Sequence, residues 1–491
     1  MPAPLTTRQQ VNGYRFLLRR LEHALIRRDV RMLHDPMRAH LRSLSIGIAL
    51  TLLAVGGCAV YGLIKPAGSV GESKIVVGKQ SGGLFVVVGD TLHPVLNVAS
   101  ARLIVGSANS PASVSDSKLQ SFSRGPLLGI AGAPTSLPGP ADASNSYWNV
   151  CDTARVPSGA GSMAGGVTLS VLGNRPESVG SNRRMAGNEA AYVQADDKRY
   201  LIYDGRRAQV DTDDAAVMRA LKLEDKQPRP ISTGLLNAFP QAPELTTPMI
   251  ANRGKQAGGP SALAARVGNL LQVSDVATGQ RTLYVVLADG IQKVTPAAAA
   301  VIAAADPAGA DPITVAPGLL TQMRSVQTLP VGEFPGEVPT VISQSDSPVL
   351  CYAWSREGES DAKVTALVGD RLPIPADRSV VQLATADGAD SGVDEFYLPP
   401  GTGAFVRSTG SNPGSTRAES LLYISDVGVR YGIPDAQTGQ ALGLGDKPQR
   451  APWAALGLLV AGPMLSRTNA LVAHDAMPAD SQAAVIDGPG N

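Results

Sequence analysis

The sequence has few of the residues that carry metal and nucleophilic chemistry. Its 491 residues include only five histidines and three cysteines. Beyond the first 40 residues, His93 and His474 are the only histidines. No cysteines and histidines have the spacing of a zinc site, and a Ser-His-Asp triad would need a histidine from an expected hairpin or tail. We therefore predict no catalytic residue, no cofactor-binding residue and no metal ligand.

A phosphate-binding loop is also missing in its standard form. Such a loop needs Gly-x-x-x-x-Gly-Lys followed by Ser or Thr, so that backbone amides surround the phosphate. Lys79 and Lys255 each follow a glycine, but Ser73 and Met249 stand where the first glycine is required. Glutamine occupies the hydroxyl position in both places. Both lysines are therefore predicted to be solvated loop residues.

Aromatic residues make up 4% of the chain, and the net charge is +1. This balance gives no sign of nucleic-acid binding. The 52 glycines and 37 prolines predict short strands and helices joined by many turns rather than one large enzyme core. Scarce aromatics also argue against a cell-wall glycan-binding module, although small β-rich repeats leave that function as an alternative.

One long apolar run stands out. Residues 44–64 carry no charge and lie between Arg42 and Lys65. As a helix, they would cross a bilayer core of about 30 Å. Residues 1–43 contain nine arginines and three acidic residues, which predicts a cytoplasmic N-terminus. A cleaved signal peptide would be shorter and have a shorter basic region. We predict a single-pass inner-membrane protein with residues 1–42 cytoplasmic, 43–65 membrane-spanning and the remainder periplasmic.

The N-terminal region also predicts a basic amphipathic helix over residues 8–34, where leucines and arginines alternate at helical spacing. Asp35-Pro36 would end this helix. Two interpretations remain open: the helix lies on anionic lipid headgroups, or it docks onto a cytoplasmic partner.

Beyond the span, one pattern occurs four times. An aromatic residue precedes a β-branched residue by ten positions, with a Gly or Asp turn between them. This spacing predicts a β-hairpin, and cap residues predict a following helix in at least two copies. Such small units must pack on neighbours to bury a core. The four pairs are Phe85/Val95, Tyr200/Val210, Tyr284/Val294 and Tyr423/Ile433.

Cys58 lies in the span, which leaves Cys151 and Cys351 as a pair in an oxidising compartment. Aromatic residues accompany both cysteines, which predicts a disulfide in a central domain. Two separate buried thiols are the alternative. The fold class is predicted as α+β: a transmembrane helix, then an elongated region of about four hairpin-plus-helix repeats around the disulfide-linked domain. The repeats are expected at 66–115, 186–250, 251–320 and 411–465, the central domain at 116–185 and 321–410, and a flexible tail at 466–491.

Several segments carry a resemblance to a known family. They are residues 30–35 of the basic head, Lys65-Pro66, residues 81–85, 96–103 and 125–134, the Val-Cys-Asp-Thr of 150–153, and the Leu-Pro-Pro-Gly of 398–401. In their order along the chain they resemble the EccB family, a membrane core component of mycobacterial type VII (ESX) secretion systems.

The resemblance implies a structural subunit of a hexameric inner-membrane channel complex, built with EccC-, EccD- and EccE-like proteins and other EccB copies. It also implies that a mycosin protease can associate on the periplasmic side. Family members are sometimes labelled ATPases, so an ATP hydrolase is an alternative function. The missing phosphate-binding loop argues against it here.

Overall fold

The structure is a computed structural model. It describes residues 6–28, 30–31, 36–64, 73–140, 142, 144–155, 166–177, 180, 182–258, 265–274, 279–309, 311–386 and 392–477. The chain forms two compact units. Residues 1–73 with 112–115 form the N-terminal unit, and residues 74–111 with 116–491 form the larger unit.

The N-terminal unit consists mainly of two helices, α1 (Arg8–Arg27) and α2 (Pro36–Ile64), and it includes strand β4 (Ala112–Val114). Helix α1 ends seven residues before the predicted end at 34. The reason is local: Arg28 takes a left-handed conformation with φ of 54° and its N–H bonds to the Ala24 carbonyl oxygen. The prediction that the helix continues past 28 is therefore wrong, and residues 29 and 32–35 lie outside the described residues.

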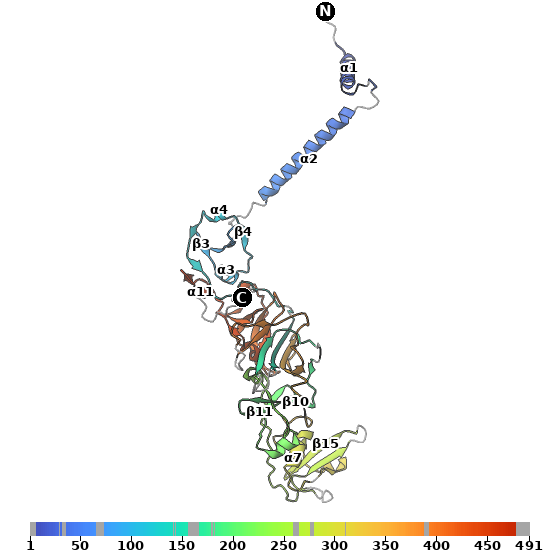
Figure 1. Cartoon of the computed structure of the whole chain (residues 1–491), viewed down its shortest axis with the longest axis vertical. Helices are drawn as coiled ribbons and strands as arrows, with labels where there is room; N and C mark the ends of the chain where they lie inside the picture. The colour runs from blue at the N-terminus through green and yellow to red at the C-terminus, as the bar shows by residue number, and fades with distance from the viewer. Residues whose placement is uncertain are drawn as a thin grey trace, which may run out of the picture. The chain divides into compact units, whose positions relative to one another are not determined.

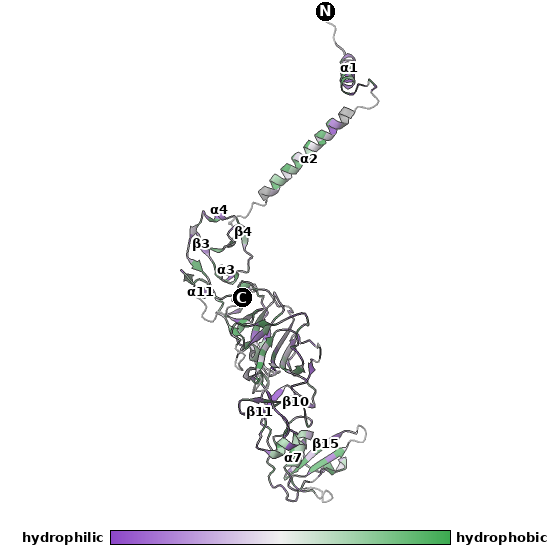
Figure 2. Cartoon of the chain, in the orientation of Figure 1, coloured by the Kyte–Doolittle hydropathy of each residue, from purple (hydrophilic) through white to green (hydrophobic). Residues whose placement is uncertain are grey.

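Helix α2 contains one candidate membrane span, His40–Tyr61, which has the length and apolar composition to cross a bilayer. Apolar residues cover most of its visible surface (Figure 2). The helix begins earlier than the predicted span, at Pro36, because proline suits the first helical position. Lys65-Pro66, on the far side of the span, lie outside the described residues.

The larger unit contains all four predicted hairpins, and the two strands of each one pair antiparallel. An additional strand precedes each hairpin and pairs with its first strand, which makes a three-stranded meander. The meanders are β1-β2-β3 (Ile75–Gly78, Leu84–Val88, Thr91–Pro94), β10-β11-β12 (Glu189–Ala195, Lys198–Tyr203, Arg206–Gln209), β14-β15-β16 (Leu270–Ser274, Arg281–Leu287, Gly290–Val294) and β23-β24-β25 (Gly403–Thr409, Leu421–Ser425, Val429–Ile433).

A helix follows every meander, and its N-cap side chain accepts a hydrogen bond from a backbone N–H of the first turn. Both predicted helix starts are present: Asp214 caps one helix, and Thr295 caps another that has Pro296 at its first position. The helices are α3 (Val98–Val105), α5 (Ala215–Ala220), α7 (Pro296–Ala304) and α9 (Ala436–Leu442).

After each of these helices the chain adds a short strand and a second helix of four or six residues. The strands β13 (Arg229–Pro230), β17 (Ile313–Thr314) and β26 (Gln449–Pro452) each pair parallel with the first strand of their meander. The second helices are α4 (Asp116–Leu119), α6 (Thr233–Ala238), α8 (Pro317–Leu320) and α10 (Trp453–Leu456).

A final extended stretch pairs parallel with the third strand of each meander. In the first and fourth cases it is a strand, β5 (Ser123–Arg124) or β27 (Val460–Ala461). In the second there are two bridges, Arg207 to Gln241 and Val210 to Leu245, and in the third a single bridge, Ile291 to Ser325. We call residues 75–124, 189–245, 270–325 and 403–461 segments 1 to 4. Three elements lie outside the ranges expected for the repeats: β5, the Ser325 bridge and β23. The reason is that the spacing of aromatic and β-branched residues marks only two strands of each segment.

A seven-stranded sheet, here called the central sheet, is built from two stretches of the chain. One stretch lies between segments 1 and 2 in the sequence, and the other lies between segments 3 and 4. The strand order of the sheet is β21-β22-β8-β7-β19-β20-β9, so strands from two separated stretches alternate. The first stretch supplies β7 (Asn145–Ala154), β8 (Val167–Leu172) and β9 (Arg183–Arg184); the second supplies β19 (Val349–Glu357), β20 (Lys363–Gly369), β21 (Val381–Gln382) and β22 (Glu395–Tyr397). A further short strand, β18 (Thr340–Val341), pairs with β10.

The segments bury their apolar faces against one another in pairs. Segments 2 and 3 share a core that includes Leu201 and Val301, and α5 contacts α7 (Figure 1). Segments 1 and 4 share another core that includes Ile104 and Leu442. In this pair, Nη1 of Arg102 in α3 donates a hydrogen bond to the Leu442 carbonyl oxygen at the end of α9, at 2.7 Å. These shared cores match the expectation that such units need neighbours.

The central sheet connects the two pairs. One of its faces packs in a single core with residues of segments 2 and 4, including Val193 and Ile424. Phe239, just after α6, meets Tyr352 of β19 edge to face, with ring centroids 5.5 Å apart. The central sheet therefore touches one member of each pair directly.

The C-terminal region differs from the predicted flexible tail where it is described. Helix α11 (Arg467–Ala470) and strand β28 (Ala473–His474) follow segment 4, and β28 pairs antiparallel with β6 (Leu127–Leu128). Ala470 is fully buried, and this apolar side chain anchors the stretch. Residues 478–491 lie outside the described residues.

Candidate functional site

The predicted disulfide between Cys151 and Cys351 is present in the central sheet. The two residues lie directly opposite each other on the antiparallel strands β7 and β19, with Cα atoms 4.0 Å apart. Both are at most 1% exposed. Trp148 faces Trp354 three residues away, so the aromatic residues beside the two cysteines meet in the same strand pair. The disulfide joins stretches that are 200 residues apart.

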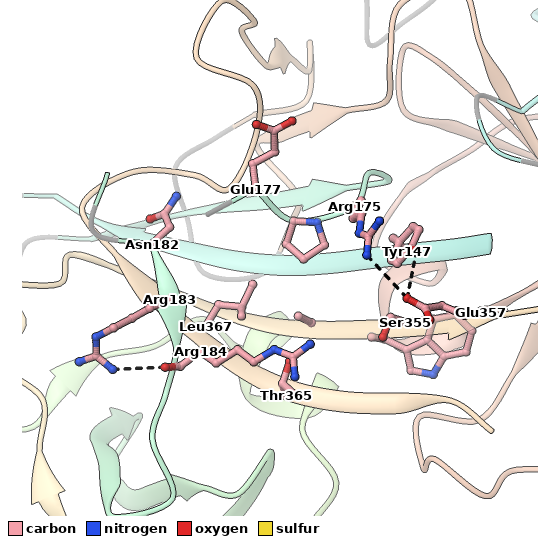
Figure 3. Close-up of a pocket in the computed structure, with 13 residues that line it drawn as sticks. Tyr147, Arg175, Glu177, Asn182, Arg183, Arg184, Ser355, Glu357, Thr365 and Leu367 are labelled. Atoms are coloured by element: carbon pink, nitrogen blue, oxygen red, sulfur yellow. Dashed lines mark hydrogen bonds and ion pairs between the residues drawn. The ribbon is translucent and has the colours of Figure 1, made fainter. Parts of the chain in front are cut away.

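The cysteine-bearing face of the sheet also carries a polar groove of about 150 Å³ (Figure 3). Arg175 lies over the Tyr147 ring at 5.7 Å, and the Tyr147 hydroxyl donates to Glu357 at 3.4 Å. Burial raises the pKa of Tyr147, while the nearby Arg175 charge lowers it. Arg183, at the edge strand β9, pairs with Glu189 at 2.6 Å. The groove offers charged groups for binding, and its lining contains neither histidine nor a free thiol.

A buried polar cluster beside the disulfide has no sequence signal. The Asp152 carboxylate, 1% exposed, accepts bonds from the Ser232 N–H at 2.6 Å and hydroxyl at 2.7 Å. Arg229, 3% exposed, donates to the carbonyl oxygens of Ser347 and Pro348 at 2.8 and 2.7 Å. Burial lowers the pKa of Arg229 to about 10, partly offset by the Asp152 charge. These hydrogen bonds hold segment 2 against the central sheet. Sequence reasoning missed them because a lone Asp or Arg predicts only a surface position.

The lysine of the first Gly-Lys pair lies in the tight turn between β1 and β2. The N–H groups of Gln80 and Ser81, which a phosphate would need, donate to the Asp116 carboxylate at 2.8 and 3.1 Å. The Ser81 hydroxyl donates to the same carboxylate at 2.7 Å. This hydroxyl bond is the main cause that lowers the pKa of Asp116, assisted by the two amides. A side-chain carboxylate thus occupies the anion position that the turn creates.

The second Gly-Lys pair also forms hydrogen bonds with nearby residues. The Gly254 N–H donates to the Val267 carbonyl oxygen, and the Lys255 N–H donates to Asn252. The Lys255 ammonium itself donates to the Asn252 side chain at 2.8 Å. Lys79 and Lys255 are both exposed turn residues, as the sequence predicted.

His93 and His474 each place a ring nitrogen within hydrogen-bond distance of a backbone carbonyl oxygen. His93 Nδ1 lies 3.1 Å from the Pro126 carbonyl oxygen, and His474 Nε2 lies 2.8 Å from that of Gly129. Within the described ranges, no three His, Cys, Asp or Glu residues form a group that could hold a metal ion.

Comparison with known proteins places these features in one family. The family model for type VII secretion system ESX-1, transport TM domain B, matches residues 3–479. The "ESX-5 secretion system ATPase EccB5" of Mycobacterium tuberculosis is 37% identical over 99% of this chain and 97% of its own length. The "ESX-3 secretion system ATPase EccB3" of Mycolicibacterium smegmatis is 36% identical over 98% of this chain and 93% of its own.

Solved structures agree with these relatives. A chain of an intact ESX-5 inner membrane complex superimposes with a TM-score of 0.74 at 34% identity, covering 99% of both chains. A chain of the EccB3 dimer from the ESX-3 core complex gives a TM-score of 0.71 at 34% identity, covering 82% of this chain and 100% of that one.

Proposed function

The chain belongs to the EccB family of type VII secretion proteins, and from this premise we propose how its parts serve the secretion complex. It is a structural core subunit of an ESX inner-membrane complex. The observation that carries this function is the whole-length likeness: a chain of the intact ESX-5 inner membrane complex matches 99% of this one.

The topology that we propose places residues 1–42 in the cytoplasm, one span at residues 43–65 and the remainder in the periplasm. The arginines before the span support this orientation, because positive charge next to a span stays cytoplasmic. The disulfide supports it as well, since such bonds persist in oxidising compartments.

In the periplasm we propose four structural repeats, segments 1 to 4, around a central domain built from two separated stretches. The support is their common order of elements: meander, helix, short parallel strand, second helix and closing strand or bridge. The partners that we propose are EccC-, EccD- and EccE-like membrane subunits, other copies of this chain and a mycosin protease.

ATP hydrolysis is the second candidate function, because the relatives carry the word ATPase in their names. Our proposal is that neither Gly-Lys turn hydrolyses ATP. Phosphoryl transfer needs free amides around the phosphates and a hydroxyl or carboxylate for Mg²⁺. In the first turn both amides and the Ser81 hydroxyl already bond Asp116. In the second, the amides bond backbone carbonyls.

The decisive experiment compares Lys79→Ala and Lys255→Ala with the parent chain, each purified as the detergent-extracted complex from cells that lack the native subunit. We expect unchanged subunit composition on native gels and unchanged secretion. ATP turnover by the complex should stay at the parent level. If either lysine variant lost turnover while the complex remained intact, the hydrolase function would replace the proposed one. A chain that never entered an inner-membrane complex would refute the scaffold role.

A further inference from the structure

Helix α1 has a polarised surface without a partner in the described chain. None of its residues is buried. At about 100° per residue, seven positions fall on one arc of roughly 140°. They are Val11, Tyr14, Leu17, Leu18, Leu21, Ala24 and Leu25. The large residues of this arc are 40% to 75% exposed.

The remaining surface of α1 is strongly basic. Arg15 and Arg20 lie about 40° beyond the two margins of the arc, Arg8 and Arg27 lie about 60° beyond them, and Arg19 lies nearly opposite its centre. Glu22 is the only acidic residue of the helix. An apolar stripe bordered by arginines is the pattern of helices that lie in the interface of an anionic membrane.

The chain keeps α1 close to a bilayer. Only seven residues, 29–35, lie between Arg28 and the first residue of α2, Pro36, which makes eight Cα-to-Cα steps. At ~3.5 Å per residue, this connection reaches no more than about 28 Å. Once α2 crosses the membrane, binding of α1 to the same leaflet becomes an intramolecular event at high effective concentration.

We propose that α1 lies on the membrane surface beside the span, with its apolar arc in the acyl boundary and its arginines on anionic headgroups. The occupant of the arc is therefore lipid. Phe16 and Ile26, the two large apolar residues outside the arc, remain on the aqueous side.

The test uses the full-length protein in vesicles. Cys58→Ser removes the thiol of the span, and the other two cysteines are already joined in the buried disulfide. Leu21→Cys places a fluorescent label on the arc, and Phe16→Cys places the matched label outside it. Brominated lipids then report contact with the acyl region by quenching. Vesicles of phosphatidylcholine alone are compared with vesicles that contain phosphatidylglycerol.

We expect the label at position 21 to be quenched about threefold or more strongly than the label at 16 when phosphatidylglycerol is present. Arg20→Glu with Arg27→Glu should reduce that quenching. The charge change should have a smaller effect in neutral vesicles. Equal quenching at 16 and 21, or none at either, would overturn the proposal. Quenching that vanished when the label at 21 was examined in the purified secretion complex would assign the arc to a protein partner instead.

Discussion

Removing the disulfide should loosen the central sheet and leave segments 2 and 3 folded. The change is the double variant Cys151→Ala and Cys351→Ala. With 200 residues between the cysteines, the chain-entropy model gives a stabilisation of about 5 kcal/mol against full unfolding. When only the central sheet opens, segments 2 and 3 still hold most of that loop together. The cross-link then closes about 60 residues, those of 152–188 and 326–350, which corresponds to about 4 kcal/mol.

The two values differ little because loop-closure entropy grows only with the logarithm of loop length. If the free energy needed to open the central sheet falls by about 4 kcal/mol, amide exchange in β7 and β19 becomes roughly a thousandfold faster. Strands β15 and β16 belong to the separate core of segments 2 and 3, so their exchange should not change.

Hydrogen-exchange mass spectrometry of the full chain measures both regions at once. Cys58→Ala serves as the control, because this thiol is exposed in α2 and bonded to nothing in the central sheet. An acceleration below tenfold in β7 and β19 would show that strand pairing alone holds the two stretches. An equal acceleration in β15 and β16 would show that all the segments unfold as one cooperative unit. Either result would refute the reasoning.

Two further outcomes follow from the polar contacts. Arg229→Met should destabilise the protein by about 3 kcal/mol, because it leaves two buried carbonyl oxygens without their donor and removes a positive charge near the Asp152 carboxylate. Thermal unfolding should show the loss, and Arg175→Met, at a largely exposed site, should not. The folded-state pKa of Asp116 is lowered, so its contribution is complete above the ordinary value of 3.8 and is lost as the pH falls through the lower folded value. The protection of the Gln80 and Ser81 amides, measured relative to their intrinsic exchange rates at each pH, should therefore fall on acidification, and Asp116→Asn should abolish this pH dependence of the protection.

The sequence predicted the parts of the fold that have a local chemical cause. Asn, Asp or Thr caps mark the helix starts, and Gly or Asp turns mark the hairpins. The disulfide followed from compartment and pairing: only Cys151 and Cys351 lie beyond the span. In each case the signal sits within a dozen residues or depends on counting one residue type.

The features that the sequence did not reveal depend on partners far along the chain. Only two of the four first strands of the meanders contain an aromatic residue, Tyr192 in β10 and Phe405 in β23, so this residue type does not mark the strand consistently. Strands such as β13 contain two residues whose pairing depends on β10. The Arg229 cluster has the same origin, because its acceptors lie 118 and 119 residues away. Order at 466–477 was missed since it rests on a distant strand, β6, and on one buried alanine.

The order of segments along the chain explains why the central sheet needs a covalent cross-link. Segments 2 and 3 pair with each other and lie between the two stretches of the central sheet, so the chain must leave that sheet after β9 and return at β19. Segments 1 and 4 also pair with each other. In the sequence, segment 1 precedes the first stretch of the central sheet and segment 4 follows the second stretch. Strands β7 and β19 join stretches that lie 200 residues apart at the two cysteines, and pairing at such a separation carries a large loop-closure cost during folding. A disulfide between directly opposed residues of that strand pair stabilises the connection at this point and leaves both segment pairs free to present their outer surfaces to other subunits.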